Sequence, residues 1–110
     1  MNKISFIGEL EQLVLLAVLR LEGDAYSTAV RAELEERTGR GVARGAVYIT
    51  LDRLVKKGYL SSRLGDPTPE RGGRAKRYFG LTPEGVAALR ASREALLKLW
   101  SGYESLLQES

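Results

Sequence analysis

The sequence predicts a mostly helical α+β fold, and three observations support this prediction. Apolar residues recur at helical spacing in four stretches, near residues 8–21, 28–38, 44–57 and 83–107. Two short segments, 59–64 and 75–81, have strand character and flank a loop rich in glycine and proline. A clear helix start follows the second strand. The pattern divides the chain into a predicted domain at 1–82 and a C-terminal helix at 83–110.

The composition excludes several classes of function. Cysteine and histidine are both absent, which rules out disulfides, thiolate or imidazole metal sites and Cys or His nucleophile–base pairs. The sequence has neither paired carboxylates at a catalytic spacing nor a phosphate-binding loop. Its longest apolar run, residues 13–19, is too short to cross a bilayer. We therefore expect a cytoplasmic protein that is not an enzyme, needs no cofactor or metal and does not enter a membrane.

The first helix is expected to start near Gly8 and is apolar nearly all round, because Leu15, Leu16 and Leu19 add to its core-facing positions. Such a helix needs cover on two sides. Two arrangements would provide this cover. Either the domain core lies on one side and a dimer partner on the other, or the helix is fully buried at the centre of the domain. The predicted core face consists of Leu10, Leu13, Val14, Ala17, Val18 and Leu21.

The second helix is assigned to the scaffold. Ser27 is predicted to cap a helix over residues 28–38, in which Val30 and Leu34 face the core. Its outer face is mostly acidic, which is unfavourable beside a polyanion. The short spacing to the next helix is that of a helix-turn-helix, in which the first helix supports the second.

The third helix has the features of a recognition helix. Its apolar stripe is Val47, Leu51, Leu54 and Val55, and Gly58 ends it. A helix that exposes Arg, Tyr and small residues near its N-terminus fits a DNA major groove. Taken alone, the pattern also fits an ordinary surface helix, and Tyr48 also fits a core position. The predicted DNA contacts from this helix are Arg44, Gly45, Tyr48, Ile49 and Arg53.

A basic hairpin follows this helix, and no acidic residue occurs between residues 71 and 78. Basic side chains on a flexible tip suit phosphates or a minor groove, although a charged tip also keeps a sheet edge soluble. Because Tyr78 and Phe79 alternate along a strand, one of them is expected in the core. Helix-turn-helix and basic hairpin together predict a winged helix-turn-helix. The predicted wing contacts are Arg71, Gly72, Gly73, Arg74, Lys76 and Arg77.

Charge is distributed unevenly along the chain. Residues 40–78 hold ten Lys or Arg and three Asp or Glu, a local charge of +7, whereas the other residues carry −4. The positive excess coincides with the predicted recognition helix and wing. Such segregation is typical of a surface that binds a polyanion.

The last helix is predicted to start at Thr82 as N-cap, followed by Pro83, and to run to about Leu107. A helix of ~25 residues is ~37 Å long, so its far half extends beyond its own domain. A second subunit related by a two-fold axis is the expected cover, and folding back on the first helix is the alternative. The predicted dimer interface is Leu89, Leu96, Leu99, Trp100, Tyr103 and Leu107.

Three blocks of the sequence resemble the PadR family of bacterial transcriptional regulators. These blocks are GELEQLVLLAVL at 8–19, GAVYITLDRLVKKGYL at 45–60 and RGGRAKRYFGLTPEG at 71–85, in the family's order and spacing. The chain length resembles the family's short branch, which has a single C-terminal helix. The resemblance implies dimerisation through that helix, repression of transcription and, in some members, release by phenolic or other planar aromatic compounds.

Trp100 and Tyr103 are the candidate ligand residues, because an aromatic pair can stack on a flat molecule. Such a pair is more often a packing anchor. The sequence thus predicts a sequence-specific homodimeric regulator that binds a palindromic operator in double-stranded DNA. The resemblance implies that it is a repressor and, as for some members of the family, that a small aromatic effector releases it. A winged-helix module that binds proteins instead of DNA is the alternative, which the basic helix and wing disfavour.

Two wing variants test this interpretation. Arg74→Ala and Arg77→Ala are expected to weaken DNA binding similarly on all sequences and to flatten its salt dependence, because each would remove a phosphate contact. Binding isotherms at several salt concentrations measure both effects. Unchanged affinity and salt slope in both variants would contradict a role for the wing.

Overall fold

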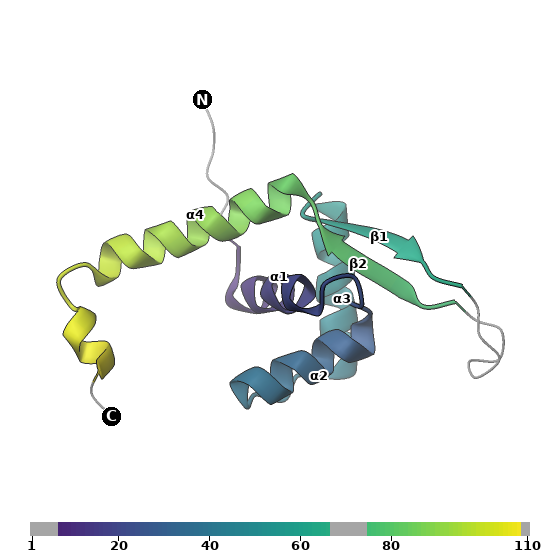
Figure 1. The fold of residues 1–110 in the computed structure, drawn as a ribbon, viewed down its shortest axis with the longest axis horizontal. Coiled ribbons are helices and arrows are strands. Elements are labelled where there is room, and N and C mark those ends of the chain that lie inside the picture. Colours follow the sequence, from purple (N-terminus) through teal and green to yellow (C-terminus); the bar gives the residue numbers. More distant parts are fainter. Residues whose placement is uncertain (1–6, 67–74, 109–110) are drawn as a thin grey trace.

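The computed structural model describes residues 7–66 and 75–108. Figure 1 shows three helices packed around one another, with a hairpin projecting on one side and the last helix on the other. This is the predicted mostly helical α+β fold, arranged as a winged helix-turn-helix. The elements are α1 (Glu9–Leu21), α2 (Ser27–Thr38), α3 (Arg44–Lys56), the antiparallel strands β1 (Leu60–Leu64) and β2 (Arg77–Leu81), α4 (Pro83–Trp100) and a 3-10 helix at Glu104–Gln108.

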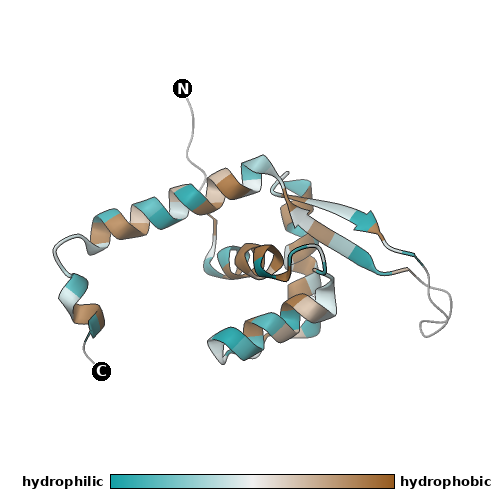
Figure 2. Cartoon of the chain, in the orientation of Figure 1, coloured by the Kyte–Doolittle hydropathy of each residue, from teal (hydrophilic) through white to brown (hydrophobic). Residues whose placement is uncertain are grey.

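One apolar core joins the three packed helices to the hairpin. Helix α1, the most uniformly hydrophobic helix in Figure 2, lies at the centre of this arrangement. Phe79 of β2 enters the core, while Tyr78 faces away and packs edge-on against Tyr26, with ring centres 5.6 Å apart. The prediction that one of the two aromatics is buried is therefore confirmed. The largest fully buried side chains are Val14, Leu15, Val30, Val47, Leu51 and Leu54.

Helix α1 is buried on one side only. Leu16 and Leu19 are 44% and 52% exposed, so full burial at the centre of the domain is excluded as an arrangement for this chain alone. The uncovered side is apolar. Burial of such surface contributes roughly 25 cal/mol per Å², which makes exposure of several leucines on one helix unfavourable.

Glu11 links the start of α1 to the end of α3. One carboxylate oxygen accepts a hydrogen bond from the Gly8 backbone N–H at 2.9 Å, and the other accepts from the Lys57 ammonium at 2.7 Å. Burial raises the pKa of Glu11, but the hydrogen bonds from Lys57 and Gly8 outweigh it and hold the pKa below its ordinary value. The buried carboxylate is therefore charged and paired at neutral pH.

Replacing Glu11 with Gln is expected to lower the free energy of unfolding at pH 7 by about 2 kcal/mol, because Lys57 loses its charged partner. The folded-state pKa lies below the ordinary value of 4.5, so this stabilisation is present above 4.5 and is lost as the pH falls through the folded pKa. In urea unfolding, the gap between wild type and variant should close toward low pH.

Glu9→Gln is the matched control for this prediction. Glu9 pairs with Arg40 on the surface, with side chains 75% and 59% exposed, so its loss should cost less than about 1 kcal/mol. Equal losses from the two variants, or a gap at Glu11 that does not depend on pH, would contradict the role given to the buried pair.

Helix α2 begins one residue earlier than predicted. Ser27 is expected from the sequence to cap the helix, but it is the first helical residue, and Tyr26 occupies the N-cap position. The reason is tertiary: extended backbone at Tyr26 forms a bridge with Tyr78 of the wing. Val30 and Leu34 are buried as predicted.

Helix α4 begins as predicted but ends early. Thr82 Oγ1 accepts from the Gly85 N–H at 3.0 Å, and Pro83 is the first helical residue. The predicted continuation to Leu107 is wrong, because the helix ends at Trp100. Gly102 adopts a φ of 91°, a left-handed conformation that glycine tolerates and that turns the chain into the 3-10 helix.

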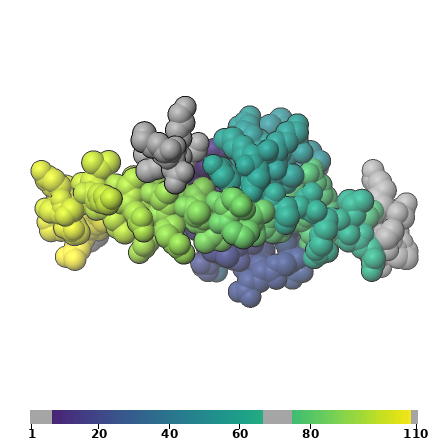
Figure 3. Space-filling view, turned by 90° about the horizontal axis from the view of Figure 1, so that it is seen from above, coloured from purple at the N-terminus to yellow at the C-terminus, as the bar shows by residue number. Residues whose placement is uncertain are grey.

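The far half of α4 leaves the body of the molecule, as Figure 3 shows. Leu89 still packs partly against the chain's own core, so only part of its surface is open to a partner. Leu96 and Leu99, by contrast, are 50% and 80% exposed. The radius of gyration is 16.0 Å, above the ~13 Å of a compact domain of this length. The far half of α4 therefore does not fold back onto the chain's own core.

Candidate nucleic-acid interface

The exposed face of α3 carries every residue predicted to contact DNA from this helix. Tyr48 is 44% and Ile49 58% exposed, so the core alternative for Tyr48 is wrong. Arg44, Gly45 and Arg53 are also exposed. The local cause is the apolar stripe of α3, which is buried and turns the opposite face outward. A basic, small-residue face at the front of a helix can enter a major groove.

Arg31 holds the turn in front of α3. Its Nε donates to the carbonyl oxygen of Val42 at 2.7 Å. Since Arg31 stands on α2, this bond fixes where the recognition helix starts, and α2 thereby supports α3. Sequence reasoning missed this residue, because nothing in the local pattern links Arg31 to a carbonyl eleven residues away.

The wing is only partly described by the structure. Arg71, Gly72, Gly73 and Arg74 lie outside the described residues. Lys76, at the base of the loop, places its ammonium 3.8 Å from the centre of the Tyr26 ring. This cation–π contact directs Lys76 toward the start of α2.

Arg77 differs most from its predicted setting. It lies at the start of β2, and its side chain is only 26% exposed. Nη1 donates to the hydroxyl oxygen of Tyr48 at 2.9 Å and to Oδ1 of Asp52 at 3.2 Å. The structure thus brings a predicted wing residue into direct contact with a predicted helix residue. It also pairs Arg77 with Asp52, an acid for which sequence reasoning predicted no role.

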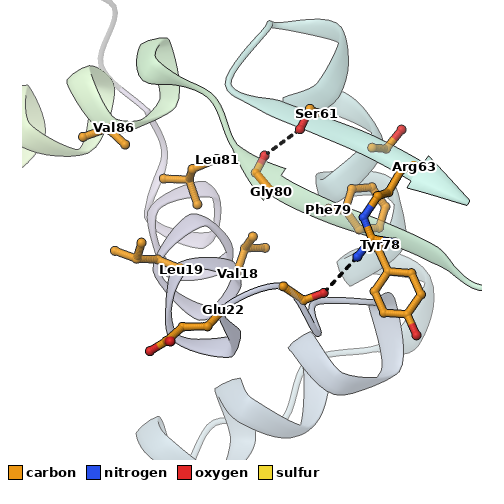
Figure 4. Close-up of a pocket in the computed structure, with 12 residues that line it drawn as sticks. Val18, Leu19, Glu22, Ser61, Arg63, Tyr78, Phe79, Gly80, Leu81 and Val86 are labelled. Carbon is orange, nitrogen blue, oxygen red and sulfur yellow. Dashed lines mark hydrogen bonds between the residues drawn. The ribbon is translucent and has the colours of Figure 1, made fainter. Parts of the chain in front are cut away.

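Arg63 of β1 attaches the other side of the wing to the body. Its Nη2 donates to the carbonyl oxygen of Gly23 at 3.3 Å, and its guanidinium lies 4.6 Å from the centre of the Tyr78 ring (Figure 4). A hollow of about 390 Å³ lies beside this contact. It is lined by the end of α1, the turn after it, both strands and Val86 of α4. The wing is therefore braced against α1 and α3 at once.

Comparison with known proteins identifies the family. Residues 15–91, well over half of the chain, match the family described as the transcriptional regulator PadR-like family. The chain belongs to this family. None of the curated proteins compared with it matches. The helix and wing described above therefore belong to a PadR-like regulator. Their arrangement is the winged helix-turn-helix of this family.

Solved structures agree with this assignment. A PadR-like transcriptional regulator from Bacillus cereus is 21% identical, with a TM-score of 0.70, and the match covers 92% of this chain and 93% of that one. A PadR family regulator from Eggerthella lenta is 27% identical, with a TM-score of 0.68 and coverage of 93% and 88%. F93 from STIV, a winged-helix DNA-binding protein, shares the fold at 17% identity, with a TM-score of 0.66 and coverage of 86% and 95%.

The PadR-like chain also has a large uncovered apolar face, made by α1, α4 and Leu107 of the 3-10 helix. It encloses a hollow of about 600 Å³. No helix within residues 7–66 and 75–108 is long and apolar enough to cross a membrane. Exposed apolar surface gathered on one side of a small domain is typical of interaction sites. The lining includes Leu16, Leu19, Leu89, Leu96, Leu97, Trp100 and Leu107, with Arg90 and Arg93 among them.

Proposed function

We propose that this chain is a homodimeric repressor that binds a palindromic operator in double-stranded DNA. The observation that carries the proposal is the contact of Arg77 with Tyr48, which places the wing directly beside the exposed face of α3. In this arrangement α3 enters a major groove, with Arg44 and Arg53 near phosphates or guanine edges. The wing, including Arg71 and Arg74, lies along the flanking phosphates.

The apolar face of α1 and α4 supports the dimer. Its leucines are half exposed in the single chain, and a second copy would bury them through a two-fold, self-complementary contact. Two recognition helices would then address half-sites about one helical turn apart, roughly 34–36 Å. Residues 83–110 serve as the dimerisation segment. A repressor that binds such an operator would act in the cytoplasm.

Release by a small aromatic ligand is the remaining part of the proposal. Trp100 and Tyr103 lie on either side of the Gly102 turn region and line an apolar hollow of about 270 Å³ together with Leu96, Leu99 and Leu106. A flat molecule stacked there would contact the end of α4 and so alter the spacing of the two subunits.

Selection from a pool of random duplex DNA at near-physiological salt, followed by sequencing, tests this function. Enrichment of a palindrome with half-sites about one turn apart is expected. Binding without enrichment would contradict sequence-specific regulation. Failure to bind any duplex would favour the protein-interaction alternative, since the same fold serves that purpose in other proteins.

A further inference from the structure

Arg77 is held on three sides in the described part of the wing. Its Nη1 donates to the Tyr48 hydroxyl and to the Asp52 carboxylate, which stand four residues apart on one face of α3. Its guanidinium also lies 4.9 Å from the centre of the Phe79 ring, a core side chain two residues along the same strand. A side chain fixed in this way has little freedom to turn toward a phosphate.

The charge of Arg77 is also compensated. Asp52 accepts from Lys56 Nζ and from Arg77 Nη1, each at 3.2 Å. These two hydrogen bonds, that of Lys56 being the larger cause, hold the pKa of the Asp52 carboxyl below its ordinary value, so it is charged at neutral pH. An arginine matched by a carboxylate releases fewer counterions from DNA than an unpaired one.

The contact determines how the Tyr48 hydroxyl is used. A phenol carries one donor proton and accepts through its oxygen lone pairs, whereas a guanidinium can only donate. The Tyr48 oxygen is therefore the acceptor toward Arg77, and its proton points away from that side chain. Tyr48 is 44% exposed on the predicted DNA face. Phosphate oxygens are acceptors and match a donor presented there.

We propose that Arg77 is a positioning residue and does not itself contact phosphate. It orients the Tyr48 hydroxyl as a hydrogen-bond donor to a DNA phosphate and locks the wing to α3, with Asp52 as its anchor. The inference rests on the proposed DNA-binding function. It replaces, for Arg77, the expectation from sequence of a direct phosphate contact, and leaves that expectation in place for Arg74.

A double-mutant cycle at constant net charge tests the proposal. Arg77→Ala combined with Asp52→Asn (the bridge variant) removes the contact of Arg77 with Tyr48 and Asp52 without changing net charge. Tyr48→Phe removes only the hydroxyl. Both changes are also combined. Affinity is measured from about 50 to 300 mM salt on the selected palindrome, or on a random-sequence duplex of about 30 base pairs if none is enriched. Thermal unfolding and dimer mass are followed in parallel.

Either change is expected to weaken binding about 10-fold per half-site without lowering the salt slope, because a hydrogen bond to phosphate is lost but no unpaired cation is removed. Asp52→Asn also frees Lys56, which can only steepen the slope. Combining them should add no more than about twofold, since both act through one hydroxyl. If the bridge variant does not fold, Arg77→Lys decides: it keeps the charge but not the guanidinium geometry, so weakened binding is expected.

Several results would overturn the proposal. A salt slope that falls by about 0.9 per half-site on removal of the bridge would show a direct phosphate contact. Independent, multiplicative losses would show that Arg77 does not act through Tyr48. Unchanged affinity of the bridge variant or wild-type binding by Arg77→Lys would remove the role altogether. These results leave the DNA-binding function intact, whereas a wild-type protein that binds no duplex overturns both.

Discussion

Replacing Leu97 with Glu is expected to convert the protein to monomers and to abolish tight operator binding. Leu97 is 51% exposed and lines the apolar hollow between α1 and α4. In a two-fold dimer the carboxylate would be buried twice among leucines, and even beside Arg93, one turn earlier on the same helix, its desolvation would cost several kcal/mol. The dimer dissociation constant should rise at least about 1000-fold, equivalent to about 4 kcal/mol. Analytical ultracentrifugation over a range of concentrations measures this change.

Ala87→Glu is the matched control for Leu97→Glu. It introduces the same side chain on the same helix at an exposed position that does not line the hollow. Dimerisation and operator affinity should stay close to wild type. If both variants remain dimeric, the apolar face is not the subunit interface. If both variants become monomeric, the added negative charge explains the loss wherever it is placed. Leu97→Ala then decides, because it adds no charge: it must also weaken the dimer if the apolar face is the interface.

Replacing Gly85 with Ala is expected to lower the free energy of unfolding by about 3 kcal/mol, at the upper end of ordinary overpacking. Gly85 is buried in the first turn of α4, where an added Cβ would clash with the Tyr59 carbonyl oxygen. That oxygen also accepts from the Thr82 N–H at 3.2 Å, and Thr82 Oγ1 donates to the Gly58 carbonyl at 2.6 Å. The clash therefore affects the junction between the end of α3 and the start of α4. Urea unfolding measures the loss.

Gly45→Ala provides the comparison for Gly85→Ala. Nothing lies within 4 Å of a Cβ built at Gly45, which is exposed in the first turn of α3. Alanine there should raise the free energy of unfolding by up to about 1 kcal/mol through helix propensity. Losses of equal size at both positions would show that the close approach to Tyr59 is not what requires glycine at residue 85.

Local patterns in the sequence predicted much of the fold correctly. The apolar stripe of α3 predicted which of its faces is buried, and therefore that Gly45, Ile49 and Arg53 are exposed, whereas the exposure of Tyr48 was left open. Thr82 and Pro83 marked the start of α4 to the residue. These predictions succeed because helical periodicity and capping depend on neighbours within one or two turns.

Contacts between distant segments decided the rest. Tyr26 displaces Ser27 as the N-cap of α2 because it pairs with Tyr78, far along the chain. Sequence reasoning also counted Arg77 as a cation for phosphate, because the acid that compensates it stands 25 residues earlier. Whether a charged side chain faces solvent or a partner depends on three-dimensional neighbours that spacing does not reveal.

The sequence by itself determined the helices, the hairpin, the basic segment and the resemblance to PadR regulators, because all of these depend on residue types and their order over short stretches of the chain. The tertiary structure decided that α4 stops at Trp100, that Leu16 and Leu19 remain uncovered, and that Arg77 joins the wing to Tyr48. The physical reason is the same in each case. A side chain's exposure and its hydrogen-bond partners are fixed only when separate elements pack together, and that packing involves residues far apart in the chain.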